Sequence, residues 1–248
     1  MDGEHTVLTD DERVKITLSL VIPFYNEEPN VGKVLVDLTA ALDAEGVNYE
    51  ILAVNNGSRD ATGERIQEMH DHNPLIVPVT IRQNRGYGYG ILEGLRRARG
   101  EIVGYAWGDG QVSTGDVMKI YRAMEEAGAD LAKAYRVKRH DGLYRLIQSR
   151  LYTFCFLLLF GAGYKDPNGC PKLFKRSLYE KAALCSHDWL LDPEIMLKAR
   201  RMEAKIENVP VVFNKRLQGK SKVRWFTCFG FLLGLLRLRA QLPMDQKS

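Results

Sequence analysis

Short apolar runs alternate with segments of helical periodicity along the first 135 residues, and this alternation constrains the fold more than any other feature. The apolar runs are ITLSLVIP (16–23), YEILAVNN (49–56), LIVPVTI (75–81), EIVGYAW (101–107) and DLAKAY (130–135). Apolar residues recur at helical spacing near 31–42, 60–72, 87–99 and 115–127. Strands that alternate with helices usually pair in parallel. The sequence therefore predicts an α/β fold with a mainly parallel central sheet and helices on both faces.

Beyond residue 140 the pattern changes to long apolar helices, at 143–160 and 225–240. Two more strands are expected there, KLFKR (172–176) and KIENVPVVF (205–213). A chain of 248 residues with 45% hydrophobic content can build one large core, and no internal repeat or low-complexity linker divides it. We predict a single domain over residues 1–248 with a flexible N-terminus over 1–15.

Cysteine usage and the hydrophobic runs bear on where the protein works. The four cysteines form no CxxC pair, which argues against a zinc site or a disulfide framework: Cys155, Cys170, Cys185 and Cys228. The acidic, polar N-terminus does not resemble a signal peptide. The apolar runs at 151–164 and 225–236 are shorter than the roughly 20 residues that span a bilayer. We expect a cytoplasmic protein, with the cytoplasmic face of a membrane as an alternative location.

The formal net charge of +4 is modest, but basic residues gather in two stretches of the second half. Clusters of this kind suit phosphate groups or an anionic membrane surface. A solvated basic face is the alternative. We expect no nucleic-acid partner. The clusters are Arg136, Lys138, Arg139, Arg145 and Arg150 in one stretch, and Lys215, Arg216, Lys220, Lys222 and Arg224 in the other.

Polar, glycine-rich segments follow four consecutive predicted strands. They are PFYNEE (23–28), NNGSRDATGE (55–64), RQNRGYGYG (82–90) and WGDGQ (107–111). In open sheets of this type, ligands bind beyond the carboxyl ends of the strands. Each segment alone is ordinary turn chemistry. Their occurrence at four successive strand ends predicts a ligand site at one edge of the sheet.

These four segments, with YKDPNGCPKLFKR and NVPVVFNKRLQGKSKVR, resemble the family 2 glycosyltransferases of the nucleotide-diphospho-sugar transferase (GT-A) fold. Within that family the chain looks most like the dolichyl-phosphate and polyprenyl-phosphate sugar synthases, over roughly residues 16–225. The resemblance implies inverting transfer of a hexose from a GDP- or UDP-sugar to a polyprenyl or dolichyl phosphate. It implies a nucleotide-sugar-binding half over 16–135 and an acceptor-binding half over 136–225. The apolar and basic residues near the end of the chain predict a C-terminal amphipathic helix over 226–248.

The segment WGDGQ corresponds to the Asp-x-Asp-x-Gln metal motif of the family, with Trp107 in place of the first acid. Mg²⁺ and Mn²⁺ prefer hard oxygen ligands, which Asp109 and Gln111 can supply. Strand geometry would project both side chains the same way, and Gly108 and Gly110 would let the donor diphosphate approach. We expect a Mg²⁺ or Mn²⁺ cofactor, at a site with fewer acidic ligands than usual because Trp107 replaces the first acid of the motif.

The resemblance also implies the residues that hold the donor. NNGS replaces the usual Asp-Asp-Gly-Ser, so these amides bind without charge, and the glycines of RGYGYG would bring a helix N-terminus near the phosphates. Plain turns and helix capping are the alternatives. The predicted nucleotide-sugar-binding residues are Pro23, Tyr25, Glu27, Asn55, Asn56, Arg82, Asn84, Gly86 and Asp109.

An acceptor phosphate is already ionised at neutral pH, so the site needs cations to hold it more than it needs a strong base. By resemblance, the acceptor-binding residues are Arg136, Arg145, Ser149, Arg216, Ser221 and Lys222. The predicted catalytic residues are Asp109, Asp192 and Arg216. Helix N-capping is the alternative role for Asp192.

Three matters stay open at this point. The helices at 143–160 and 225–240 can lie on a membrane surface, or pack on the sheet or on a second subunit in a homodimer. A glycosyltransferase of the same fold with a soluble acceptor, such as a nucleoside or secondary metabolite, is an alternative function. A non-catalytic nucleotide-sugar-binding protein is a second alternative.

Overall fold

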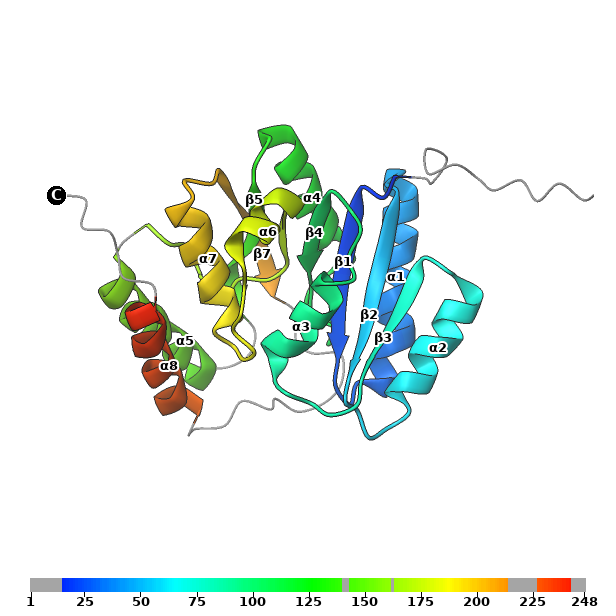
Figure 1. Ribbon diagram of the computed structural model, residues 1–248, viewed down its shortest axis with the longest axis horizontal. Helices are drawn as coiled ribbons and strands as arrows, with labels where there is room; N and C mark the ends of the chain where they lie inside the picture. The colour runs from blue at the N-terminus through cyan, green and yellow to red at the C-terminus, as the bar shows by residue number, and fades with distance from the viewer. Residues whose placement is uncertain (1–14, 140–142, 162, 214–226, 242–248) are drawn as a thin grey trace, which may run out of the picture.

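The computed structural model describes residues 15–139, 143–161, 163–213 and 227–241, and within them a seven-stranded sheet in the order β3-β2-β1-β4-β6-β5-β7 (Figure 1). The strands are β1 (Leu18–Phe24), β2 (Tyr49–Asn56), β3 (Ile76–Ile81), β4 (Ile102–Tyr105), β5 (Leu131–Arg139), β6 (Lys172–Lys175) and β7 (Ile206–Phe213). The helices are α1 (Glu28–Glu45), α2 (Thr62–His72), α3 (Tyr87–Leu95), α4 (Thr114–Ala127), α5 (Leu143–Phe160), α6 (Arg176–Ala182), α7 (Leu191–Arg201) and α8 (Thr227–Gln241). The predicted flexible segment 1–15 lies outside the described residues except for Lys15.

The predicted mainly parallel sheet is confirmed. β1 pairs in parallel with β2 and β4, β2 with β3, and β5 with β7. β6 runs antiparallel to both of its neighbours, β4 and β5. The direction of β6 could not be read from its sequence, because the apolar pattern of a four-residue strand is the same in either direction.

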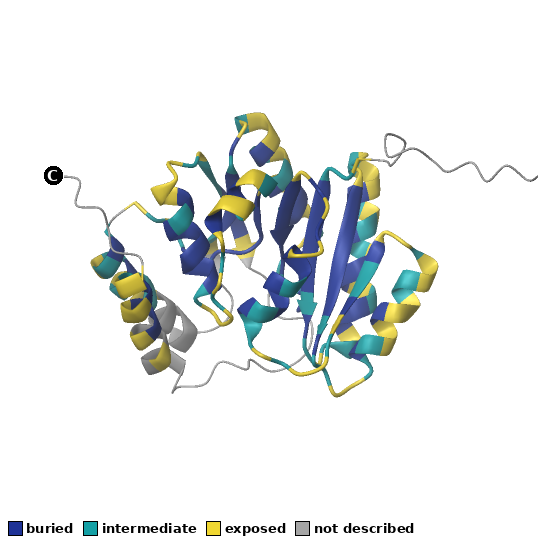
Figure 2. Cartoon of the chain, in the orientation of Figure 1, coloured by how far each residue is buried: buried dark blue, intermediate teal, exposed yellow. Residues whose placement is uncertain are grey.

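Helices cover both faces of the sheet, as the alternation predicted. Successive residues of a strand point to opposite faces, so Leu20 and Ile22 of β1 pack with α1 and α4. Val21 between them packs with α3 and α7 on the other face. Figure 2 shows the resulting buried sheet between partly exposed helices.

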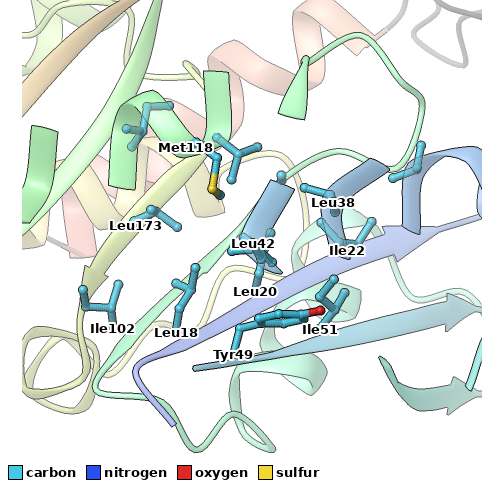
Figure 3. Packing of buried hydrophobic residues seen from close by; sticks show 14 of the residues in the cluster. Leu18, Leu20, Ile22, Leu38, Leu42, Tyr49, Ile51, Ile102, Met118 and Leu173 are labelled. Carbon is cyan, nitrogen blue, oxygen red and sulfur yellow. The ribbon is translucent and has the colours of Figure 1, made fainter. Parts of the chain in front are cut away.

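The cluster beneath α1 and α4 includes Leu38 and Leu42 of α1, Met118 of α4 and Ile51 of β2 (Figure 3). Local signals fix where these helices begin and end. The hydroxyl of Ser113 accepts the Asp116 amide at the start of α4. Both α1 and α4 end at a glycine in the left-handed region, at φ 68° and φ 56°.

Two helices, α5 and α8, lie side by side beyond α7 at one end of the molecule (Figure 1). Phe156 and Phe160 of α5 pack against Leu235 and Leu238 of α8 and against Leu197 of α7. Both helices were predicted; residues 226 and 242–248 of the predicted C-terminal helix lie outside the described residues. Among the described residues, no helix is long and apolar enough to cross a membrane.

The seven-residue helix α6 was not predicted. It directly follows β6, and buries only Leu178 and Ala182. Two buried positions in seven residues are too few for a helical period to stand out in a sequence.

Candidate active site at the carboxyl edge of the sheet

The loops that follow β1 and β2 are bound to each other at the carboxyl edge of the sheet. The Asn26 amide donates to the Ser58 hydroxyl at 3.0 Å, and the Arg59 amide donates to the Asn26 side chain at 2.8 Å. Asn26 has φ 49°, in the left-handed region that asparagine tolerates better than most residues. The two polar segments that the sequence singled out therefore form one continuous rim.

The loops after β2 and β3 are joined in the same way. The Asn56 side-chain amide donates to the Gly86 carbonyl at 3.1 Å. Gly57 has φ 74°, and a side chain there would collide with the backbone of Asn84. The Asn56 Oδ1 atom is buried and has no hydrogen-bond partner among the described residues. A buried amide oxygen of this kind could accept a hydrogen bond from a ligand or a water molecule.

Local hydrogen bonds hold several of the predicted donor-binding residues. The Glu27 carboxylate accepts the Asn30 side chain at 2.6 Å, and its amide donates to Thr62 at 3.0 Å. Asn55 Oδ1 accepts the Ser58 amide at 3.0 Å, and Asn84 Oδ1 accepts the Gly86 amide at 2.8 Å.

The remaining residues predicted to bind the donor differ in exposure. Pro23 and Tyr25 are half-buried, and Arg82 is exposed at the end of β3. All of these residues lie on the rim. Their contacts with a nucleotide stay a prediction.

The glycines of RGYGYG have a role that the sequence did not indicate. Side chains at Gly86 and Gly88 would collide with the backbone of residues 186–188, and one at Gly90 would lie 2.8 Å from the Asn56 amide nitrogen. The Tyr89 amide donates to the His187 carbonyl at 2.9 Å. The glycines therefore bring a protein segment, 183–190, onto the start of α3.

Asp109 and Gln111 come together in a turn, and the prediction that strand geometry aligns them is wrong. β4 ends at Tyr105, and Gly110 has φ 70°. The Asp109 carboxylate accepts the Gln111 amide at 3.1 Å, which closes the turn. A Cβ at Gly108 would lie 2.6 Å from the Phe24 ring, so this glycine is required by packing against β1.

The composition of this turn decides how a divalent cation could be held. Among the described residues no group of three or more His, Cys, Asp or Glu side chains could bind a metal. Asp109 and Gln111 are 7% and 5% exposed and supply one carboxylate and one amide oxygen. Mg²⁺ is commonly bound by one or two carboxylates and completed by substrate phosphates and water. The residues fit a cation that arrives with, or is completed by, a diphosphate.

Trp107, in the place of the first acid of the motif, turns toward α3. Its indole nitrogen donates to the Tyr87 hydroxyl at 2.8 Å. The Tyr87 ring stacks on Trp189, with ring centroids 4.3 Å apart and planes inclined by 12°. Burial, aided by the charge of Asp192, raises the pKa of Tyr87 well above its ordinary value. Tyr87 therefore stays a neutral hydroxyl that can accept from Trp107.

Asp192, at the start of α7, is 2% exposed and lies in a buried polar centre. Its Oδ1 accepts the Tyr105 hydroxyl at 2.7 Å and forms an ion pair with the buried Lys172. Lys172 also donates to the Gly169 carbonyl at 2.7 Å. Burial and the charge of Asp192 raise the pKa of Tyr105 well above its ordinary value. These contacts tie α7 to β4 and β6.

Arg136, predicted to bind the acceptor, is paired with Asp166. The Arg136 Nε donates to Asp166 Oδ2 at 2.6 Å, and a second nitrogen of the guanidinium bonds Oδ1. Burial alone would raise the pKa of Asp166, but the charge and hydrogen bonds of Arg136 outweigh it and lower the pKa to about 2. Asp166 therefore fixes the orientation of the Arg136 guanidinium, and a phosphate contact of Arg136 stays a prediction.

Lys133 of β5 lies beside this pair and opposite Lys172 of β6. Its ammonium nitrogen donates to the carbonyls of Ala134 at 3.0 Å and Asp166 at 2.8 Å. Burial, and next the charge of Lys172, lower the pKa of Lys133 to about 7. A neutral amine has two hydrogens to donate, which matches these two carbonyls.

Glu194, two residues after Asp192 in α7, organises the segment 183–190. Its carboxylate accepts the amides of Cys185 at 3.1 Å and Ser186 at 2.8 Å, and pairs with Lys198 at 2.6 Å. Burial would raise the pKa of Glu194, but Lys198 and the Ser186 amide lower it below its ordinary value. Glu194 therefore fixes the segment that covers the start of α3.

Several predicted acceptor residues cannot be placed. Arg216, Ser221 and Lys222 lie outside the described residues, and Arg145 and Ser149 lie on α5 with undescribed side chains. Sequence reasoning missed Tyr87, Tyr105, Lys133, Lys172 and Trp189. Two lysines inside apolar strand-like runs were the one available signal, because a charge in a buried strand usually needs a partner.

The chain is similar to curated sugar transferases over most of its length. The chain is 27% identical over 232 residues to an undecaprenyl-phosphate 4-deoxy-4-formamido-L-arabinose transferase of Edwardsiella ictaluri, covering 93% of this chain and 70% of that protein. It is 29% identical over 224 residues to a dolichyl-phosphate beta-glucosyltransferase of Trichomonas vaginalis, covering 84% and 69%.

Solved structures agree on the fold. Glucosyl-3-phosphoglycerate synthase from Mycobacterium tuberculosis, in complex with Mn²⁺, UDP and glucosyl-3-phosphoglycerate, matches with a TM-score of 0.70 at 16% identity, over 94% of this chain and 82% of that one. A mannosyltransferase from Pyrobaculum calidifontis with GDP-mannose and Mn²⁺ matches with a TM-score of 0.65 at 18% identity, over 95% and 66%. The family model of glycosyl transferase family 2 matches residues 19–184. This chain, with its GT-A fold, therefore belongs to glycosyl transferase family 2 and is a glycosyltransferase.

Proposed function

We propose that this glycosyltransferase moves a hexose from a UDP- or GDP-sugar to a polyprenyl or dolichyl phosphate, with inversion at the anomeric carbon. An acceptor phosphate oxygen attacks the anomeric carbon as the bond from that carbon to the donor diphosphate breaks. The nucleoside diphosphate leaves with the bonding electron pair. The observation that carries the proposal is the rim of four polar segments at the carboxyl ends of β1 to β4, in which hydrogen bonds link the first segment to the second, the second to the third, and the third to the fourth.

The nucleoside part of the donor would lie over the loops after β1 and β2. Tyr25 and the amides of Asn55 and Asn56 offer an aromatic ring and uncharged polar groups to a base and ribose. The unpartnered Asn56 Oδ1 supports this role, because a buried acceptor costs free energy until a donor reaches it. Arg82, exposed at the end of β3, would lie near the phosphates.

Asp109 and Gln111 would hold Mg²⁺ or Mn²⁺ against the donor diphosphate. The cation would offset the negative charge that grows on the leaving diphosphate. The relatives of known structure that bind Mn²⁺ with UDP or GDP-mannose motivate the cofactor. With one carboxylate available, Asp109 is the single charged ligand of the described site.

The acceptor phosphate is already an anion, so this chain needs no strong base to activate it. Asp192 is buried and bonded to Tyr105 and Lys172, which suits a positioning role for α7 better than proton removal. Arg136, Arg145, Ser149, Arg216, Ser221 and Lys222 are the proposed phosphate-binding set. The polyprenyl-phosphate relatives motivate a lipid acceptor.

Exposed apolar side chains on the neighbouring helices α5 and α8 suit a surface that contacts a lipid substrate. Leu151, Phe154 and Leu158 lie on one side of α5 and are 58%, 64% and 75% exposed. On α8, Leu233 and Leu236 are also exposed. Arg150 and Arg237, both exposed, flank these residues. We propose that this surface contacts an anionic membrane from the cytoplasmic side, because apolar side chains beside basic ones favour that interface.

The proposal is tested by transfer of labelled sugar from a panel of UDP- and GDP-sugars to polyprenyl phosphate, with Mn²⁺ or Mg²⁺ present and then chelated. Metal-dependent label in the organic phase supports it and identifies the donor. Asp109→Asn should lower the rate at least about a hundredfold, as loss of a group that stabilises transition-state charge does. Asp71→Asn, on the exposed side of α2, is the matched control and should leave the rate unchanged.

Two results would favour the alternatives. Label that moves only to a water-soluble acceptor would indicate the soluble-acceptor glycosyltransferase, to which the uncharged Asn55 and Asn56 and the Trp107 substitution also point. Donor binding without any transfer would indicate a nucleotide-sugar-binding protein, and would contradict catalysis. For the membrane surface, Phe154→Ser with Leu158→Ser should abolish sedimentation with vesicles that contain anionic lipid; unchanged sedimentation would exclude that surface.

A further inference from the structure

An aromatic row of three residues joins the metal turn to the segment before α7. Trp107 donates to the Tyr87 hydroxyl at 2.8 Å, and Tyr87 stacks on Trp189 at 4.3 Å between centroids. Trp107 lies two residues before Asp109, and Trp189 lies three residues before Asp192. The row therefore spans the space between the proposed cation ligand and the start of α7.

Trp189 ends this row with an exposed indole. It is 37% exposed although one face of its ring is covered by Tyr87. The exposed area therefore belongs to the opposite face and the ring edges. An exposed large aromatic ring loses the free energy of apolar burial unless a ligand covers it.

The backbone around Trp189 is held on both sides. The His187 carbonyl accepts the Tyr89 amide at 2.9 Å, and the Leu190 amide donates to Asp188 at 2.9 Å. Glu194 binds the amides of Cys185 and Ser186 on the same segment. In Figure 1 the loop between α6 and α7 lies beside the start of α3 at the carboxyl edge of the sheet. Trp189 is thus a preorganised surface, and a ligand that stacks on it pays little ordering entropy.

The order of the strands across the sheet indicates which part of the donor would reach the Trp189 ring. The proposed nucleoside site lies over β1 and β2, and Asp109 follows β4, the next strand in the sheet order. Beyond β4 comes β6, which is tied to the start of α7 by the pair of Lys172 with Asp192. A donor with its base over β2 and its diphosphate at β4 would carry its sugar toward α7. This step rests on the proposed function.

We propose that Trp189 is the stacking platform for the hexose ring of the donor, backed by Tyr87 and anchored by Trp107. A hexopyranose has faces of C–H groups, which pack on an indole and exclude water while the hydroxyl groups stay hydrated or bonded at the ring edge. Trp189 then contributes to binding of the sugar and adds nothing to binding of the nucleotide.

The test compares a nucleotide sugar with its free nucleotide by calorimetry on the full chain with Mn²⁺. The probes are UDP-glucose with UDP and GDP-mannose with GDP, using the pair that the wild type binds. Trp189→Ala should raise the Kd of the nucleotide sugar about three- to tenfold and leave the Kd of the nucleotide within about twofold. Trp189→Phe, which keeps an aromatic face, should recover most of the loss.

Two further variants sharpen the result. Trp107→Phe keeps an aromatic ring and removes the hydrogen bond to Tyr87. It should therefore weaken binding of the nucleotide sugar in the same selective way, but less. Leu75→Ala is the control, because Leu75 is 44% exposed at the amino end of β3, opposite the rim. It should change neither Kd.

The outcomes separate this inference from the proposed function. If Trp189→Ala raises the Kd of the nucleotide sugar and the Kd of the free nucleotide equally, Trp189 is a structural residue of the loop, and the proposed stacking role is wrong. An unchanged donor Kd with a raised KM for polyprenyl phosphate would assign the ring to the lipid acceptor, and would also overturn it. If the wild type binds none of the four probes, the proposed donor is wrong, and the platform falls with it.

Discussion

Replacing Lys172 by methionine should destabilise the protein strongly, because it leaves the buried carboxylate of Asp192 without its cation. Lys172 and Asp192 are 0% and 2% exposed, so water cannot replace the lost partner. Removing one member of a buried ion pair typically costs about 3–5 kcal/mol. Methionine keeps the length and most of the volume of the lysine stem, so cavity formation adds little.

Two other changes at the ion pair of Lys172 with Asp192 have effects on the unfolding free energy that can be estimated. Tyr105→Phe removes one hydrogen bond to a charged group and keeps the ion pair, so it should cost about 1.5–3 kcal/mol. The double variant Lys172→Met with Asp192→Leu removes both charges. It should recover part of the loss, because an apolar pair of similar volume is often as stable as a buried ion pair. The recovery is incomplete because the Tyr105 hydroxyl and the Gly169 carbonyl both lose the partner they have in the wild type.

Urea unfolding of the full chain, followed by circular dichroism at pH 7.5, measures these differences. The exposed pair of Lys175 with Asp130 is the control, since those side chains are 45% and 37% exposed. Lys175→Met should change the unfolding free energy by no more than about 1 kcal/mol. A loss below about 1 kcal/mol in Lys172→Met, or a double variant no more stable than Lys172→Met, would refute the reasoning.

Three further predictions concern pH and backbone conformation. The pKa of Lys133 is lowered to about 7 from 10.5, so above pH 7 the unfolded chain binds more protons than the folded chain, and the unfolding free energy of the wild type should rise with pH. In urea titrations at pH 7, 8 and 9, Lys133→Met should lack that rise. The pKa of Asp166 is lowered to about 2 from 3.8, so the contribution of its carboxylate to stability is present above about pH 4 and is lost toward pH 2. The difference in unfolding free energy between the wild type and Asp166→Asn should vanish over that range. A difference that stays constant would contradict this prediction. Gly57→Ala should lower the Tm and cost at least about 1 kcal/mol, because Gly57 has φ 74° and its Cβ would meet the Asn84 backbone, whereas Gly32→Ala in open space on α1 should be neutral or stabilising.

Local sequence signals were enough for most of the secondary structure. The prediction for β2, residues 49–56, matches the observed strand, and the Ser113 cap and the glycine after α4 place that helix within a residue of its expected bounds. Glycine-rich polar turns after four successive apolar runs located the rim loops, and the family resemblance assigned them to a nucleotide-sugar donor. These features depend on residues close together in the chain, and short-range patterns record them.

Side-chain pairings over long sequence separations were not predictable. Asp109 and Gln111 were identified, but the turn that joins them replaced the expected strand geometry because β4 ends at Tyr105. Asp192 was identified without its partner Lys172, 20 residues away. No local pattern records such a contact.

The sequence by itself determined the α/β class, the order of the strands along the chain and the rim loops, because apolar periodicity and glycine-rich turns are local properties. Only the tertiary structure decided the antiparallel direction of β6 and the stack of Tyr87 on Trp189. Only it decided that Arg136 is already paired with Asp166. These depend on which elements the packed core brings together, and burial there makes each pairing obligatory, since an unpaired buried charge or polar group would cost several kcal/mol.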